Sequence, residues 1–330
     1  MSNLTTPASV QKLQTALHDK AKEAPDFRFH ALYDKVYRKD VLAFAYDCCK
    51  ANGGTAGVDG QTFEDIETYG RERWLDELAQ ELKSRTYQPL PVRRVYIPKP
   101  DGKQRPLGVP AIRDRAAEVA AVLVLEPIFE ADLPPEQYAY RRDRSALDAV
   151  RRVHKLVNTG HGEIVDADLS SYFDTLPHSE LLKSVARRVV DGAMLHLIKM
   201  WLEAPVEETD ESGNKRRSTR NRDEGRGTPQ GSPMTPRTQK INLNLSGRSS
   251  LRGGSGIAND TPSSLDVCLL RLYLYVVCLA PLLLNGRSAS IDPEPCFSFV
   301  HHSPKPFNSS SDRAPFLHVR LTDISSRPNA

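Results

Sequence analysis

The sequence predicts an α+β fold of helices and short strands, followed by a C-terminal tail that is irregular or disordered. Apolar residues recur every three or four positions from residue 13 to 52, which is typical of amphipathic helices. Two stretches, 92–97 and 164–169, instead alternate from one residue to the next, as half-buried strands do. After residue 236 the composition changes abruptly to serine, proline, asparagine and arginine, so a packed core is not expected there.

Whole-chain properties favour a reduced, cytoplasmic globular protein. The 330 residues carry a net charge of +3, so the total charge alone does not indicate a nucleic-acid partner. Five cysteines show no C-x-x-C or metal-finger spacing, and the N-terminus has no basic segment followed by an apolar core. The apolar run 267–284 is interrupted by Arg271 and Pro281, so no membrane span is expected.

The first 130 residues predict helices separated by one loop. The glycine-rich stretch 53–60 is expected to be a loop, because glycine weakens regular elements. Thr62 and Asp65 are expected to cap one following helix that carries the apolar residues of 74–82. The apolar run that starts at residue 116 predicts a buried helix ending near Pro127.

Positive charge is concentrated between Lys83 and Arg115. This region contains nine lysines and arginines and two aspartates, which gives it a net charge of +7. Within this region the strand 92–97, a turn at 98–102 and a return strand from Arg105 predict a basic hairpin. Cations on a hairpin suit phosphate groups, and they equally suit a solvated edge hairpin that resists aggregation. Composition does not separate the two.

The segment 138–144 mixes tyrosine with arginine, which suits base stacking and phosphate contact as well as an ordinary surface loop. Ser145 and Asp148 predict a capping box for a helix that ends at Asn158. Its expected apolar stripe consists of Ala146, Val150, Val153 and Val157.

Two more helices are expected, one starting at Pro177 and one ending near Trp201. The charged segment 207–226 predicts an exposed hairpin or a flexible loop. Small residues in 227–233 would allow close approach of a backbone or a nucleotide, although a plain turn explains them equally well.

The strand 164–169 places Asp166 and Asp168 on one face, with Asp168 at its tip. Carboxylate oxygens are ligands that Mg²⁺ prefers, and two such ions can clamp a phosphoryl transfer. The same spacing also occurs in salt-bridged surface pairs and in metal-dependent glycosyltransferases. The motif alone does not decide among these.

The order of the blocks resembles the reverse transcriptases encoded by group II introns, which are also called maturases. The resemblance covers about residues 17–235, and the glycine block G-T-A-G-V-D-G resembles the N-terminal extension of that family. The blocks that carry it are Y-I-P-K-P-D-G-K-Q-R-P-L-G-V-P, I-R-D-R, L-E-P-I-F-E, Y-A-Y-R-R-D-R-S-A-L-D-A-V, D-A-D-L-S-S-Y-F-D and G-T-P-Q-G-S-P-M.

The resemblance implies a right-hand polymerase fold of fingers and partial palm. It divides the chain into a helical N-terminal extension (1–60), fingers and incomplete palm (61–236) and an atypical, poorly ordered tail (237–330). The implied reaction is RNA-directed DNA synthesis with two Mg²⁺ ions, in the retrohoming and splicing of a mobile intron. The implied partners are the group II intron RNA, an RNA template, a DNA primer and dNTP.

The resemblance also implies site residues. Asp168 would bind metal beside the backbone carbonyl of Leu169, with Asp166 in a supporting role, and Phe173 would reject a ribose 2′-hydroxyl. The other implied residues are Lys99 and Arg105 on the triphosphate, Gln230 and Gly231 against the nascent pair, and Arg141 and Arg144 near the template.

The sequence departs from the family pattern in two places. Arg142 and Asp143 stand where the family commonly has Pro-Gly, so an altered turn is expected. The family has a Y-A-D-D hairpin after the fourth block, but this sequence contains no adjacent pair of aspartates. A chain truncated after that block and inactive alone is therefore expected. The alternatives are a non-catalytic RNA-binding remnant and, with little support, a glycosyltransferase.

Overall fold

The computed structural model describes residues 4–98, 102, 104–139, 141, 143–160, 163–169, 172–210, 212–228, 230–235 and 317–323. For the strands at 163–169 and 317–323, and for Tyr172, it describes the backbone alone. The described residues fall into two compact units. Unit 1 contains residues 4–134 and 172–235, and unit 2 contains 135–169 and 317–323. Each is described by itself.

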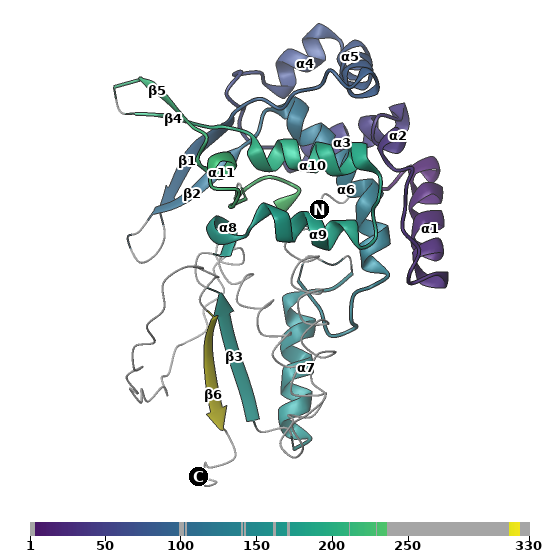
Figure 1. Cartoon of the computed structure of the whole chain (residues 1–330), viewed down its shortest axis with the longest axis vertical. Coiled ribbons are helices and arrows are strands. Elements are labelled where there is room, and N and C mark those ends of the chain that lie inside the picture. The colour runs from purple at the N-terminus through teal and green to yellow at the C-terminus, as the bar shows by residue number, and fades with distance from the viewer. Residues whose placement is uncertain are drawn as a thin grey trace. The chain divides into compact units, whose positions relative to one another are not determined.

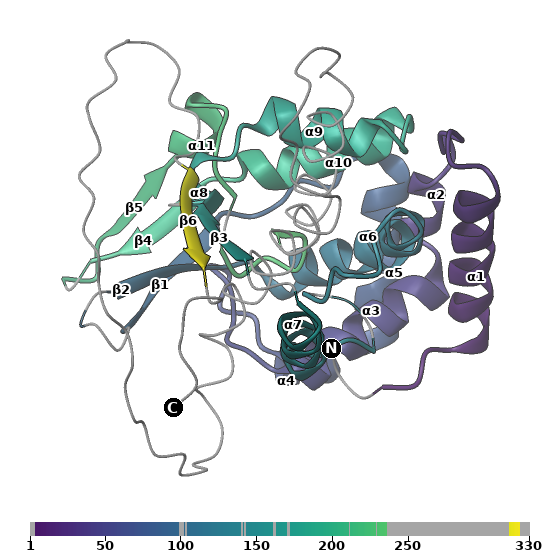
Figure 2. The same ribbon diagram turned by 90° about the horizontal axis from the view of Figure 1, so that it is seen from below.

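The core of unit 1 is built on helix α6 (Ile112–Glu130), which is apolar on nearly every side. The helices α1 (Ala8–Glu23) and α3 (Lys39–Asn52) pack along it, as Figure 2 shows, and α2 (Tyr33–Val36) also contacts it. Because α6 is surrounded, alanines and branched aliphatic residues occupy most of its length. The helices predicted between residues 13 and 52 are confirmed.

The prediction that the buried helix ends near Pro127 was wrong, because α6 continues to Glu130. Proline has no N–H group, so the carbonyl of Leu123, one turn earlier, lacks its helical partner. The side-chain amide of Gln14 on α1 donates to this carbonyl at 3.0 Å. A contact from a distant helix thus satisfies the group that the proline leaves unpaired.

The helix predicted after Thr62 forms as two helices, α4 (Phe63–Tyr69) and α5 (Arg71–Ser84). The predicted cap is confirmed, since Thr62 and Asp65 form a reciprocal capping box. The prediction of one helix was wrong, because Gly70 adopts φ +107° and ends the first helix.

A four-stranded sheet has the order β2-β1-β4-β5. The predicted basic hairpin is confirmed as β1 (Val92–Pro98) and β2 (Gln104–Val109), with Ile97 opposite Arg105. β4 (Val206–Thr209) pairs parallel to β1 and returns as β5 (Lys215–Ser218). The charged segment after residue 206 therefore contains a hairpin, which projects from the helices of unit 1 in Figure 1.

Four further helices complete unit 1: α8 (Tyr172–Thr175), α9 (His178–Ala186), α10 (Gly192–Glu203) and α11 (Arg220–Asp223). The helix predicted after Pro177 and the helix predicted to end near Trp201 are both confirmed. Arg188, just after α9, is 4% exposed and binds the N-terminal segment. Its guanidinium pairs with Asp132 at 3.1 Å and donates to the main-chain carbonyls of Ala21, Ala24, Pro25 and Phe27.

In unit 2, α7 (Ala146–Asn158) begins at the predicted capping box of Ser145 and Asp148. The predicted apolar stripe was partly wrong. Val150 is 53% exposed, and Ala149 is buried instead because it packs against Tyr138 together with Val153.

The strand β3 (Glu163–Leu169) forms as predicted and pairs antiparallel with β6 (Leu317–Asp323), so one segment of the predicted irregular tail is a strand. The apolar run 267–284 lies outside the described residues. Of the described helices, none combines the length and apolar composition that crossing a membrane requires.

Candidate nucleotide site

Unit 1 brings together three of the residues predicted to contact nucleotide. The guanidinium Nε of Arg105, on β2, donates to Oε1 of Gln230 at 3.2 Å. The backbone N–H of Gly108, on the same strand, donates to the carbonyl of Gln230 at 2.6 Å. Arg105 and Gln230 are 125 residues apart in the sequence, and the loop 230–235 lies directly against the basic hairpin.

Gly231 makes this close approach possible. It has φ +116°, and a Cβ atom at this position would lie 2.5 Å from the carbonyl oxygen of Gly108. Both the conformation and the space therefore exclude a larger side chain. The expectation that small residues in 227–233 allow close approach is confirmed for an approach between two backbones.

Phe173 joins the same assembly through its backbone. Its carbonyl accepts hydrogen bonds from the N–H of Thr228 at 2.7 Å and from the Thr228 hydroxyl at 3.3 Å. The ring Nε2 of buried His178 donates to the carbonyl of Gly227 at 2.7 Å. The segment that leads to Gln230 is thus fixed to the chain at Phe173 and at His178.

The far side of the loop 230–235 rests on a buried carboxyl group. The Ser232 hydroxyl donates to Glu118 of α6, and it accepts the N–H of Met234 at 3.2 Å. Glu118 and Ser232 are 3% and 4% exposed. Burial raises the pKa of Glu118 to about 8, which outweighs the hydrogen bond from Ser232 that favours the charged form.

Several cations of the predicted basic region support the fold instead of facing a ligand. Arg115 donates to the carbonyls of Gly53 and Thr55 in the glycine loop, and Arg93 donates to the Thr55 hydroxyl at 2.7 Å. Arg113 forms an ion pair with Glu81. The sequence shows the concentration of charge, but only the long-range contacts show which cations are already paired.

The remaining predicted phosphate and template residues belong to unit 2 or lie outside the described residues. Lys99 lies outside the described residues. In unit 2, Arg144 lies over the ring of Tyr138 at 5.4 Å, and Arg141 donates to the carbonyl of Gln137 at 3.1 Å. Asp143 adopts φ +58°, a left-handed conformation that aspartate tolerates better than most residues. Asp143 therefore adopts, at this turn, the left-handed conformation that glycine would adopt most easily.

The metal prediction concerns β3. The backbone of Asp168 lies opposite His318 of β6, and that of Leu169 opposite Leu317. The side chain of Asp168 is not among those described. Among the described residues there is no group of three or more His, Cys, Asp or Glu side chains that could hold a metal ion. The magnesium role of Asp168 stays a prediction from the sequence.

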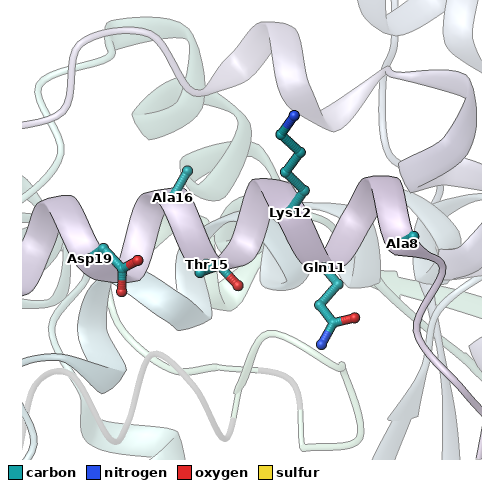
Figure 3. Close-up of a pocket in the computed structure, with 6 residues that line it drawn as sticks. All are labelled: Ala8, Gln11, Lys12, Thr15, Ala16 and Asp19. Atoms are coloured by element: carbon teal, nitrogen blue, oxygen red, sulfur yellow. The ribbon is translucent and has the colours of Figure 1, made fainter.

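Two grooves of unit 1 lie elsewhere and contain none of the predicted site residues. One, of about 470 Å³, follows α1, and Figure 3 shows that its Lys12 and Gln11 extend in different directions. The other, of about 380 Å³, is lined partly by Trp74, Glu77 and Glu81, whose polar groups already bind neighbouring side chains. Neither groove presents converging unpaired groups.

Comparison with known proteins shows what this chain is similar to. A family described as reverse transcriptase (RNA-dependent DNA polymerase) matches residues 97–249, which include Arg105, Asp168 and Gln230. The group II intron-encoded protein LtrA of Lactococcus lactis subsp. cremoris is 30% identical over 224 residues, covering 68% of this chain and 35% of LtrA. The chain is therefore similar to the group II intron-encoded reverse transcriptases.

Two other proteins are similar to this chain. Protein YkfC of Escherichia coli K12 is 36% identical over 242 residues, which cover 71% of this chain and 61% of YkfC. The putative COX1/OXI3 intron 1 protein of Saccharomyces cerevisiae is 28% identical over 197 residues, covering 60% of this chain and 22% of the relative. The chain thus spans about three fifths of YkfC and about a third of LtrA. The α+β class and the mixed sheet agree with the fingers and palm of this family.

Proposed function

We propose that this chain contains the nucleotide-binding part of an RNA-directed DNA polymerase, a nucleotidyltransferase that copies RNA into DNA for a group II intron. Its substrates would be dNTP, an RNA template and a DNA primer, and its RNA partner would be the intron. The observation that supports this most is the hydrogen bond from Arg105 to Gln230, next to which Gly231 packs on Gly108 of the same strand, because residues predicted for one task from distant blocks meet in unit 1.

The described geometry suits a triphosphate more than a sequence-specific contact. Arg105 supplies a fixed cation whose Nε is oriented by Gln230. Gly231 has no side chain, so its backbone packs directly on the Gly108 carbonyl of β2 and keeps the loop 230–235 close to the strand that carries Arg105. Phe173, held through its carbonyl by Thr228, would limit the sugar that enters. Each residue positions the nucleotide, which is what phosphoryl transfer chiefly requires of a protein.

Mg²⁺, held by Asp168 and the carbonyl of Leu169, would neutralise charge that develops on the phosphates. Lys99 would add a second cation for the triphosphate, and Arg141 and Arg144 would contact the template. These roles come from the sequence resemblance, and mutation of each residue tests them separately.

Nucleotide binding tests the proposal directly. We expect the full chain with Mg²⁺ to bind dNTP in equilibrium dialysis, and R105A to weaken binding about 10- to 100-fold, since a hydrogen bond to a charged group contributes about 1.5–3 kcal/mol. The matched control R94A removes the same charge from the same hairpin at a residue outside the Gln230 contact, and we expect a change below threefold. Equal losses in both variants would contradict a specific site.

A second candidate function, non-catalytic RNA binding, is favoured by the absence of an adjacent aspartate pair from the sequence. One carboxylate does not bind two ions well, so we expect no robust primer extension by this chain alone. Synthesis on an RNA template that disappears in D168A would refute that expectation.

RNA binding separates the second candidate from a chain without any nucleic-acid role. We expect binding of structured RNA that weakens steeply with salt, because phosphate contacts release counterions. The charge reversal R94E suits this test better than reversal of Arg93, Arg113 or Arg115. Those three side chains bind other parts of unit 1, so their reversal would also destabilise the fold. Absence of binding at low salt would exclude this candidate.

A further inference from the structure

Glu118 is a buried carboxyl group that is not among the residues predicted to bind nucleotide, metal or template. It lies on α6, behind the loop 230–235, and is 3% exposed. A carboxyl group in an apolar core is unfavourable, and a hydrophobic side chain of similar volume would normally be at least as stable there. Its contacts therefore indicate why a polar group occupies this position.

Those contacts lead to the loop that carries Gln230. The Ser232 hydroxyl donates to Glu118 and accepts the N–H of Met234, so the carboxyl group fixes the serine in one orientation. Ser232 is itself 4% exposed, so water does not readily replace this hydrogen bond. The carboxyl group and the hydroxyl form a short buried connection between α6 and the loop.

The opposite side of the loop is fixed to β2. Gln230 accepts the N–H of Gly108 through its carbonyl and the Nε–H of Arg105 through its side chain. Gly231 packs on the carbonyl of Gly108. The loop is therefore held between two supports, and the distance between α6 and β2 sets where Gln230 and Gly231 lie.

We propose that Glu118 is a positioning residue for the incoming nucleotide: acting through Ser232, it holds Gln230 and Gly231 against β2 beside Arg105. This inference rests on the proposed function. Burial raises the pKa of Glu118, which agrees with a carboxyl group that is neutral at physiological pH. A neutral carboxyl group can accept and donate hydrogen bonds, and it leaves no buried charge.

Three variants of the full chain separate positioning from general stability. E118L removes the hydrogen-bonding group and keeps the volume, whereas E118Q keeps hydrogen bonding without a charge. L125A creates a cavity at a buried residue of the same helix that takes no part in the hydrogen bonds of the loop 230–235 described above. Denaturant unfolding establishes how far each variant is destabilised.

Two measurements are then made on the folded variants: the affinity for dNTP with Mg²⁺, and hydrogen exchange of the Gly108 amide, whose N–H donates to Gln230. We expect E118L to weaken dNTP binding about tenfold and to accelerate Gly108 exchange about tenfold, since one buried hydrogen bond is lost. E118Q should stay within twofold of the wild-type chain in dNTP affinity and in the exchange rate of the Gly108 amide. L125A should change these two quantities only as far as it lowers the free energy of global unfolding.

The outcomes distinguish the two proposals. A wild-type chain that binds no dNTP refutes the proposed function and the nucleotide role of Glu118 with it. A wild-type chain that binds dNTP, with E118L indistinguishable from L125A in affinity and in Gly108 exchange, refutes the positioning role alone. Failure of E118Q to restore both properties would also refute it, because the argument depends on hydrogen bonding and not on charge.

Discussion

Replacing Glu118 with glutamine tests whether this carboxyl group is protonated in the folded protein at neutral pH. Burial raises its pKa from the ordinary 4.5 to about 8, so the folded chain keeps a proton that the unfolded chain has released. The free energy of unfolding therefore falls as pH rises from about 4.5 to about 8, by about 1.4 kcal/mol per pH unit. Glutamine does not titrate, so E118Q lacks this dependence.

The expected magnitude follows from the two pKa values. From pH 6 to pH 9, Glu118 should cost the wild-type chain about 3 kcal/mol of stability that E118Q does not lose. The assay is urea unfolding at several pH values, followed by tryptophan fluorescence. Both tryptophans, Trp74 and Trp201, are buried in unit 1, so the signal reports on the unit that contains Glu118.

E77Q is the matched control in this experiment. Hydrogen bonds from Tyr69 and Arg73 lower the pKa of exposed Glu77, so this residue is ionised in both states throughout pH 6–9. We expect the stability difference between E77Q and the wild-type chain to stay constant over that range. A constant difference for E118Q as well would show that Glu118 is ionised in the folded protein, and the reasoning about its burial would be refuted.

Three further predictions concern the supports of unit 1, each measured by urea unfolding. R188M should lose about 3–5 kcal/mol, because it leaves a carboxylate and buried carbonyls unpaired, whereas R187M, at an exposed neighbour, should lose less than about 1 kcal/mol. Y87F should lose about 1–3 kcal/mol, because its hydroxyl joins a buried carboxylate and an indole N–H; an unchanged midpoint would contradict this network. G231A should lose more stability than G213A, since both have positive φ but only the first adds a backbone clash; equal losses would show that the loop moves freely.

Local sequence signals predicted the parts of the fold that depend on nearby residues. The two capping boxes, the basic hairpin and the glycine loop all follow from residues within a few positions of each other. Prediction was wrong where a distant contact changed the local preference. The end of α6 is the clearest case, because Gln14 accommodates Pro127 from more than a hundred residues away. The break at Gly70 shows that a single glycine inside a helical pattern divides one helix into two.

The candidate site shows the same division. No spacing rule relates Arg105 to Gln230, and only the family resemblance assigns them to one task. The sequence places Glu118 in a buried helix, but a single acidic residue in an apolar run gives no sign of its partner. A signal was nevertheless present: a carboxyl group within the apolar stretch 116–125 of a buried helix requires a hydrogen-bonding partner. The serine of the 230–235 loop is that partner.

Arg188 also constrains how the chain can fold as it is synthesised. Its bond to the carbonyl of Ala21 spans 167 residues, so the end of α1 is made long before the side chain that satisfies it. At about 5–20 residues per second, this delay is roughly 10–30 seconds. During that time the N-terminal helices can form and contact α6, but they cannot complete their attachment. The N-terminal extension is therefore among the first segments made and among the last to be fixed in place.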